Sequence, residues 1–227
     1  MRINVFLWCT VGLLAVSGAG YAQDVLRGMV TVDSEPVWAA LPGNESSGQT
    51  GTYPLSWRDA QLAALSGAMD FFSGMIYGWE FEYEVGEKAR NVEEAFDWMP
   101  LGELSFGDMR MRPDDSDREG SILRLWADYE MDAAQTARRG AWLSGQLRVI
   151  NARGRAGLNE DGRNSLRDAA KQAVRSLVRG RERERPKTVR GRIALAEFPA
   201  VTLMDGEWSA SAKFFVEIRE IQKYKGY

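Results

Sequence analysis

Two segments of the chain carry apolar residues at the three- and four-residue spacing of a helix that buries one face. Each segment follows a serine, Ser56 or Ser165, whose side chain can accept a hydrogen bond from the first turn, and each has an aspartate three residues later. The apolar members are Leu62, Leu65, Met69 and Phe72 in the first segment, and Leu166, Ala170, Ala173, Val174 and Leu177 in the second. The pattern predicts two amphipathic helices that start at these serines and pack one face on a sheet.

A two-residue alternation, which is typical of strands, is clearest over residues 77–85. Aromatic or aliphatic side chains alternate there with glycine and glutamate, so that Glu80, Glu82 and Glu84 share one face. This segment is predicted to be a strand with one aromatic and one acidic face.

Each half of the chain then ends in two further strand-like segments separated by turn residues. The pairs are residues 104–111 with 122–131 around the turn-rich stretch 113–120, and residues 192–198 with 208–218 through Asp205 and Gly206. Both pairs are predicted to form hairpins.

The two halves resemble each other in sequence. The strand-like residues 26–32 match residues 143–149, and the helix start at residues 56–60 matches residues 165–169. Because a strand, a helix and closing strands recur in the same order, we expect a duplication. The predicted fold class is α+β, with two β-α-β-β modules that each have an antiparallel sheet packed by one amphipathic helix. We expect the modules to be residues 23–132 and residues 133–227.

The second helical segment carries a family resemblance. Residues 163–178 place Arg167, Asp168, Ala169, Ala173 and Val174 as in the N-terminal domain of flagellar assembly protein T and in the related LPP-type outer-membrane lipoproteins. The resemblance implies a non-catalytic component of the envelope or the flagellar motor, with no catalytic residues to transfer. This chain lacks the lipidated cysteine of the lipoproteins, so their mode of attachment is not implied.

The start of the chain has the three parts of a secretory signal peptide. Arg2 supplies the positive charge, an apolar run follows over residues 5–16, and small residues precede an expected cleavage after Ala22. The run is too short to cross a bilayer, which needs roughly twenty apolar residues. We therefore expect residues 1–22 to be removed and the mature chain to be periplasmic, with no transmembrane segment.

Composition narrows the chemistry that the mature protein can perform. The chain has no histidine, and its single cysteine, Cys9, lies in the predicted signal peptide. Imidazole-based catalysis, thiolate nucleophiles and the usual zinc ligands are thereby excluded. Carboxylates, lysine and tyrosine remain, and the simplest expectation is a non-enzymatic protein without a cofactor.

Charge is distributed unevenly along the chain, although the net charge is only −3. Residues 78–132 contain sixteen Asp and Glu against six Lys and Arg, whereas residues 133–192 contain five against sixteen. Either the two regions face each other, or the basic region meets an anionic partner.

Basic residues recur at four-residue steps along the second predicted helix and would form a ridge opposite its apolar stripe. The members of this basic ridge are Arg163, Arg167, Lys171, Arg175 and Arg179. The ridge could be a solvated helix face with local ion pairs, or it could bind an envelope protein or an anionic membrane surface. Export argues against a nucleic-acid partner.

Two further patterns point to a ligand. Residues 115–120 imitate the start of a calcium loop, but the twelfth position is Trp126 instead of glutamate, which favours a plain hairpin turn. A glycan site could use Trp38 and Trp79 with Glu80 and Glu82, or the glutamates could form a solvated strand face. The sequence therefore predicts a non-enzymatic interaction or structural protein of the cell envelope. The alternative is a carbohydrate- or peptidoglycan-binding protein or a carboxylate-dependent glycan hydrolase.

Overall fold

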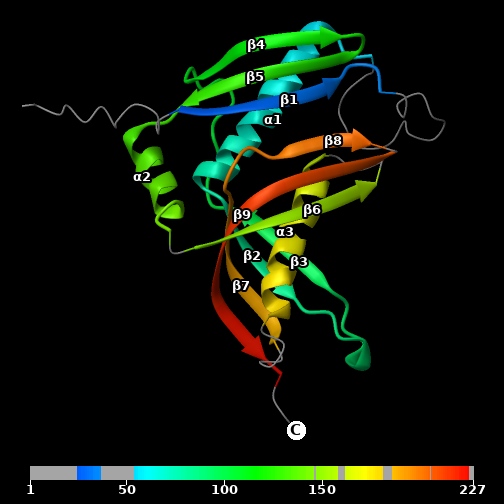
Figure 1. The fold of residues 1–227 in the computed structure, drawn as a ribbon, viewed down its shortest axis with the longest axis vertical. Coiled ribbons are helices and arrows are strands. Elements are labelled where there is room, and N and C mark those ends of the chain that lie inside the picture. The colour runs from blue at the N-terminus through cyan, green and yellow to red at the C-terminus, as the bar shows by residue number, and fades with distance from the viewer. Residues whose placement is uncertain are drawn as a thin grey trace, which may run out of the picture.

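The computed structural model describes residues 25–36, 54–145, 147–157, 162–180, 186–204 and 206–224. Within these ranges the chain forms helices and antiparallel sheets, which confirms the predicted α+β class (Figure 1). The elements of the first half are β1 (Val25–Asp33), α1 (Trp57–Ile76), β2 (Trp79–Glu84), the short 3-10 helix η3 (Lys88–Arg90), β3 (Ala95–Pro100), β4 (Met111–Glu119) and β5 (Ile122–Glu130). Those of the second half are α2 (Ala133–Trp142), β6 (Arg148–Gly157), α3 (Gly162–Arg179), β7 (Pro186–Leu195), β8 (Ala200–Met204) and β9 (Glu207–Lys223).

The strands form two antiparallel sheets. A three-stranded sheet has the order β1-β5-β4, and a larger sheet has the order β3-β2-β7-β9-β6, with β8 paired to β9. In Figure 1 the three-stranded sheet lies at the top and the larger sheet below it. Helix α1 packs on β1, β5 and β7, and α3 packs on β6 and β9. None of the helices in the described ranges is long and apolar enough to cross a membrane.

The two halves have similar but unequal element orders: the first runs β1, α1, β2, β3 and the hairpin β4–β5, and the second runs α2, β6, α3, β7 and the hairpin β8–β9. The first strand of each half pairs with the last, β1 with β5 and β6 with β9. Strands β2 and β3, however, lie in the larger sheet, because β2 pairs with β7. The halves therefore share a sheet and one hydrophobic cluster, which includes buried residues from Leu26 to Val216.

The predicted match between residues 26–32 and 143–149 is wrong in register, because β6 begins only at Arg148. The structure makes a different pair of glycines equivalent. Gly28 of β1 lies opposite Ala127, and Gly154 of β6 lies opposite Ala210. A Cβ at Gly154 would stand 2.1 Å from the backbone nitrogen of Ala169, so this glycine lets α3 lie directly on β6.

Helix α1 begins as predicted, but its buried face is shifted. The Ser56 hydroxyl caps the helix by accepting from the Asp59 N–H at 3.1 Å. Met69 and Phe72 are buried, whereas Leu62 is 40% exposed. The stripe against the strands is made largely by alanines, Ala60, Ala64 and Ala68. Small side chains at the contact let the helix approach the sheet, and the apolar pattern alone did not reveal this.

The predicted stripe of α3 is confirmed over Leu166, Ala170, Ala173 and Val174, which are all buried. The predicted start is wrong, because the helix begins at Gly162. Ser165 lies buried in the first turn, where its hydroxyl donates to the Gly162 carbonyl at 2.7 Å instead of capping the helix.

The first hairpin also differs from the prediction. Residues 113–119 belong to strand β4 and not to a turn, and the tight turn lies at Gly120 and Ser121. Strand β4 is an exposed edge, so its polar side chains need no apolar alternation, and Pro113 is accommodated next to a register shift. Residues 104–110 form a loop.

Several elements were not predicted at all. They are α2, β3 and β8. The predicted pairing of residues 192–198 with 208–218 is found between β7 and β9, from Arg192 to Leu195, but β8 lies between these strands in the sequence, so they do not form a hairpin. Strand β7 covers residues 186–195, and β9 is longer than the predicted 208–218 because it pairs with both β7 and β8 along one side. The strand predicted at residues 77–85 is confirmed as β2.

Gly78 makes the turn from α1 into the larger sheet. Its φ is +71°, a left-handed value that favours glycine, and a Cβ there would stand 2.4 Å from the carbonyl oxygen of Ile193 in β7. Both the backbone conformation and the close approach therefore require this residue.

Arg139 of α2 is buried and forms hydrogen bonds to backbone carbonyls of both halves. It is 7% exposed and donates to the carbonyl oxygens of Met75 (2.8 Å), Leu195 (2.7 Å) and Ala196 (2.6 Å). Trp142 donates to the Ile76 carbonyl at 3.2 Å. The bonds to Met75 and Ile76 satisfy free carbonyls at the C-terminal end of α1, where a positive charge is also favourable, and the bonds to Leu195 and Ala196 hold the end of β7.

The two requirements at Gly78 can be separated by a matched substitution. Gly107 also has a positive φ, +85°, but nothing lies within 4 Å of a Cβ placed there. We expect Gly107→Ala to lower the free energy of unfolding by about 1 kcal/mol, from backbone strain alone. Gly78→Ala should cost about 3 kcal/mol, because the methyl group also collides with β7. Urea denaturation measures both, and equal losses would contradict the close approach.

Arg139 has a natural control in its neighbour. Arg138 is exposed and lies over the Tyr77 ring at 5.5 Å. We expect Arg139→Ala to lower the free energy of unfolding by about 3 kcal/mol, because buried carbonyls lose their donor. Arg138→Ala should cost less than about 1 kcal/mol. The role assigned to Arg139 is wrong if the two variants unfold at the same urea concentration.

Candidate functional site

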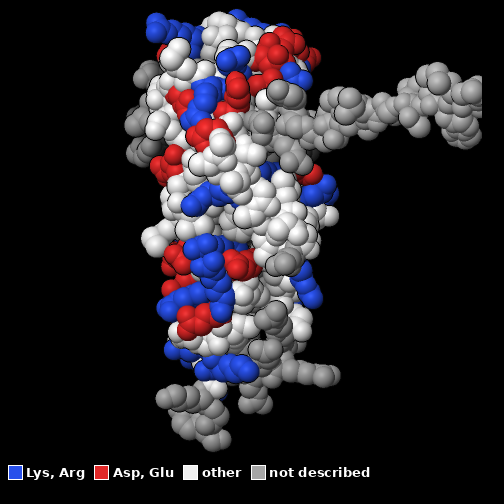
Figure 2. All heavy atoms as spheres, turned by 90° about the vertical axis from the view of Figure 1, so that its left-hand side faces the viewer, with Lys and Arg blue, Asp and Glu red and all other residues white. Residues whose placement is uncertain are grey.

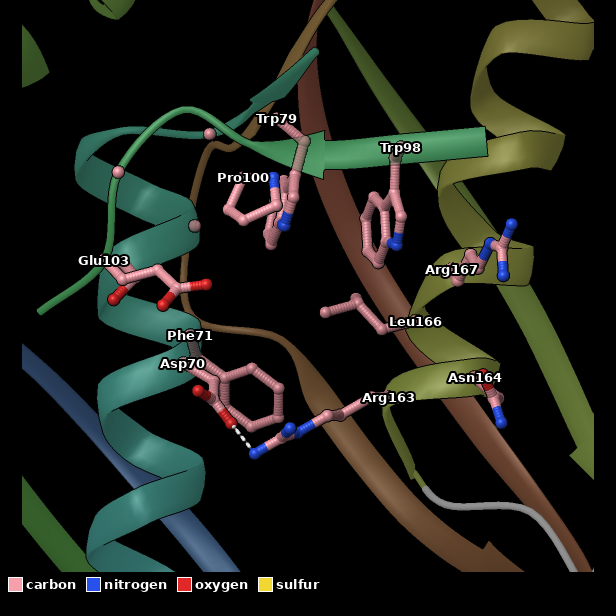
Figure 3. A pocket seen from close by; sticks show the side chains of 14 residues that line it. Asp70, Phe71, Trp79, Trp98, Pro100, Glu103, Arg163, Asn164, Leu166 and Arg167 are labelled. Atoms are coloured by element: carbon pink, nitrogen blue, oxygen red, sulfur yellow. Dashed lines mark ion pairs between the residues drawn. The ribbon is translucent and has the colours of Figure 1, made fainter. Parts of the chain in front are cut away.

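A pocket of about 260 Å³ lies where the helices of the two halves meet. Its walls are α1, the start of β2, the end of β3 with the following loop, and the first turns of α3 (Figure 3). We call it the tryptophan pocket, because the indole rings of Trp79 and Trp98 form one wall. In Figure 3 these rings extend side by side from β2 and β3 toward Phe71 and Leu166.

The two indole rings are held rigidly. Trp79 and Trp98 stack with their centroids 4.4 Å apart and an angle of 17° between the planes. A Cβ on Gly74 would stand 2.1 Å from the Trp79 ring, so α1 has a glycine where this ring packs. Neither indole N–H donates to another of the described residues. The pocket wall thus combines apolar ring surface with two donors that a ligand can use.

Polar groups line the opposite side of the tryptophan pocket. Arg163 of α3 forms an ion pair with Asp70 of α1, which Figure 3 shows as a bridge between the two helices. Glu103 is exposed, lines the pocket and forms no ion pair with another described residue. The loop that carries it is held to α1, because the Leu104 N–H donates to the Ser73 hydroxyl at 3.0 Å.

The structure separates the residues predicted for a glycan site. Trp79 lines the tryptophan pocket, whereas Glu80 and Glu82 point to the opposite face of the sheet. Glu82 pairs there with Arg190 at 2.9 Å, and the hydrogen bond from this guanidinium lowers the pKa of Glu82. Trp38 lies outside the described residues.

Sequence reasoning missed Trp98 as the partner of Trp79. The available signal was the alternation of Phe96 and Trp98 over residues 95–100, a segment too short to stand out beside its acidic surroundings. Asp70 and Glu103 were also not predicted as site residues. Nothing in the sequence indicates that α1 and the loop after β3 line one pocket.

Most of the basic ridge is engaged in ion pairs with the first half. Arg167 contacts Asp97 at 2.9 Å and donates to the Phe96 carbonyl, and Arg175 contacts Glu94 at 3.4 Å. Arg163 pairs with Asp70 as described above, and Lys171 pairs with Asp168 within α3 at 2.8 Å. Arg179 lines a second hollow at the other end of α3. The ridge therefore joins α3 to α1 and to the segment around β3.

The same pairing accounts for part of the uneven charge along the sequence. Basic side chains from residues 133–192 contact acidic ones from the first half, and Figure 2 shows both signs interspersed over the face that it draws. Burial raises the pKa of Tyr83 well above its usual range, and its hydrogen bond to Glu94 adds to this effect. That Glu94 also binds Arg175, so the ion pairs extend into the buried layer.

Residues 115–120 do not form a calcium loop. They continue strand β4 into its turn, and Asp117 and Glu119 both pair with Arg124 of β5, at 3.1 Å and 2.9 Å. Among the described residues, no group of three or more acidic side chains is placed to hold a metal ion.

A polar cluster beneath the loop after β3 was also missed. Arg110 pairs with Asp108 at 2.7 Å and with Asp132 at 2.8 Å, and the Tyr129 hydroxyl donates to Asp108 at 3.0 Å. The hydrogen bond from Arg110 lowers the pKa of Asp108 to about 2, and burial raises that of Tyr129 to about 12. These groups fix the loop that leads from Glu103 back to β4.

The Arg167–Asp97 ion pair of the basic ridge is exposed, with 42% and 81% of the two side chains accessible, so its contribution to stability is small. We expect the coupling between Arg167→Ala and Asp97→Ala, from a double-mutant cycle on the free energy of unfolding, to be about 0.5 kcal/mol. It should fall further in 1 M NaCl, where charges are screened within about 3 Å. Coupling above about 2 kcal/mol would contradict this description of the ridge.

Comparisons with known proteins give a family without a known activity. An uncharacterized protein of Treponema pallidum (strain Nichols) is 25% identical over 235 residues, which cover 99% of this chain and 95% of that protein. No solved structure matches the chain significantly. The resemblance to flagellar assembly protein T and to LPP-type lipoproteins is wrong, because the family model that matches belongs to neither family. The chain belongs to this uncharacterized family, whose model matches residues 17–224.

Proposed function

We propose that this protein is an exported, non-enzymatic component of the cell envelope that binds a glycan of the peptidoglycan type in the tryptophan pocket. The observation that carries the proposal is the pocket itself. It joins the stacked indoles of Trp79 and Trp98 to a rim that bears Glu103 and the Arg163–Asp70 ion pair.

The pocket offers the groups that a sugar ring requires. A sugar presents C–H patches between hydroxyl groups, and Phe71, Leu166 and the indole rings supply apolar contact for the former. The two indole N–H groups are donors for hydroxyl oxygens, and the Glu103 carboxylate is an acceptor for hydroxyl protons. The volume, about 260 Å³, lies just below the usual range of roughly 300–1,000 Å³ for small-molecule pockets, which suits a single sugar unit of a longer chain.

The residues that line the pocket favour a glycan-binding protein over a glycan hydrolase. A glycosidase needs two carboxylates that flank the scissile bond, one of them free to act as an acid. Asp70 and Glu103 are the carboxylates in the pocket lining, and Asp70 is held in an ion pair with Arg163. Glu80 and Glu82 lie on the other face of the sheet and do not line the pocket, so they cannot supply the second carboxylate. The chain has no histidine to replace them.

Export rests on the sequence. The predicted signal peptide, residues 1–22, lies outside the described residues, and its three-part pattern supports delivery to the periplasm, where peptidoglycan is found.

The proposal is tested by sedimentation with insoluble peptidoglycan sacculi. We expect the mature protein to co-sediment, and Trp98→Ala to weaken binding at least tenfold through the loss of ring contact and a donor. Trp57→Ala is the matched control, because Trp57 is an exposed tryptophan at the start of α1 that does not line the pocket. Its binding should remain within twofold of the wild-type value.

A second variant tests the pocket in case Trp98→Ala fails to fold. Glu103→Gln changes one exposed carboxylate and should keep the melting temperature while weakening binding severalfold. Equal binding by all four proteins, or no sedimentation of the wild type, would refute the glycan proposal. Release of soluble sugar fragments from the sacculi would show an enzyme.

A further inference from the structure

A second surface of the molecule has the composition of a docking site. The three-stranded sheet is covered by α1 on one face, where Leu123, Leu125, Ala127 and Tyr129 are buried. Alternate residues of the same strands point away from α1 and form the outer face of the sheet at the top of Figure 1. We call this outer surface the acidic face. It is distinct from the tryptophan pocket.

The centre of the acidic face is apolar. Met29 of β1 and Trp126 of β5 are direct cross-strand partners, and Met29 is 42% exposed. Val25, further along β1, is 46% exposed. Methionine and tryptophan are enriched in the centres of protein interfaces, where a large side chain fills a cavity of the partner.

Charged residues surround this centre, with acidic groups in excess. Arg27 contacts both Asp114 and Asp128, and Arg124 contacts both Asp117 and Glu119, so each guanidinium is shared by two carboxylates. On the described strands, the face has seven carboxylates against three guanidinium groups. The acidic members are Asp33, Asp114, Asp115, Asp117, Glu119, Asp128 and Glu130, and the basic ones are Arg27, Arg112 and Arg124.

We propose that the acidic face docks a partner protein through a basic surface that places an apolar side chain on Met29 and Trp126. An apolar centre with a polar rim is the arrangement of specific interfaces. The excess of carboxylates steers and orients a surface rich in lysine and arginine. An anionic lipid surface would be repelled by the same charges. A second copy docked by twofold symmetry would oppose one acidic face to another.

The edges of the three-stranded sheet are β4 and β1, and β1 contacts β8 of the larger sheet. At the β4 edge, the structure favours docking on the face over addition of a strand. Edge strand β4 has charged residues along its length and a register shift between Pro113 and Asp115. Both features hinder pairing with another strand. A partner is therefore expected to contact side chains, and its binding should depend on charge.

The test is site-specific photo-cross-linking of the full chain in the cells that produce it. A benzophenone amino acid replaces Met29 in one strain and, as the control, Val149 in another. Val149 is 53% exposed on β6 of the larger sheet. We expect a discrete protein adduct from position 29 only, with the cross-linked peptide of the partner rich in lysine and arginine.

Charge variants then decide whether the adduct reflects the proposed recognition. Asp115→Lys/Asp117→Lys should lower the adduct yield at least tenfold, and Asp115→Asn/Asp117→Asn, which perturbs folding less, at least threefold. Replacing the partner's cross-linked lysines or arginines by glutamate should restore the adduct with the lysine variant. Trp126→Ala should also lower the yield at least fivefold, whereas Trp57→Ala should leave it unchanged.

Several outcomes would overturn the proposal. They are no adduct from position 29, an equal adduct from position 149, an adduct with lipid or with a second copy of this chain, and an adduct that is insensitive to the charge variants. Loss of sacculus binding would leave this proposal intact, because the two sites share no residue.

Discussion

The pairing of β2 with β7 is the contact on which the arrangement of the molecule depends. Six consecutive residue pairs, from Trp79 with Ile193 to Glu84 with Thr188, carry a strand of the first half into the sheet of the second. Gly78 permits the turn that starts this strand, and Arg139 holds the end of α1 to the end of β7. As a result α1 and α3 stand over neighbouring strands of one sheet, and the tryptophan pocket forms between them.

The sequence predicted what is decided locally. The cap at Ser56, the alternation along β2 and the apolar stripe of α3 depend on neighbours within a few residues, and all three are found. Strand β4 escaped prediction because an exposed edge strand needs no apolar face. Trp98 and Asp70 were not recognised as site residues, because their meeting depends on which strands pair across the halves. No local pattern in the sequence specifies that β2 pairs with β7.

The uneven charge along the sequence allowed two interpretations: the acidic and basic regions pair with each other, or the basic region binds an anionic partner. The ion pairs favour the first for the basic ridge. The basic ridge reaches Asp70, Asp97 and Glu94, so most of its charge is neutralised within the molecule. A surface that is internally paired attracts an anionic partner weakly, since binding would have to replace contacts already made. The acidic face differs, because there the carboxylates outnumber the guanidinium groups that bind them. Of these two surfaces, the outer face of the three-stranded sheet therefore has the larger uncompensated charge, whereas on α3 most of the ridge is paired.

The tryptophan pocket is suited to binding because its walls are already fixed. Binding is weakened when flexible side chains must be ordered, by about 0.5–1.5 kcal/mol of binding free energy for each side chain. Trp79 is confined between Gly74 and Trp98, and the loop of Glu103 is tied to Ser73. The two helices that form the opposite walls are joined by the Arg163–Asp70 ion pair and rest on one sheet. A ligand that fits the pocket therefore meets aromatic surface and donors whose positions need little further ordering.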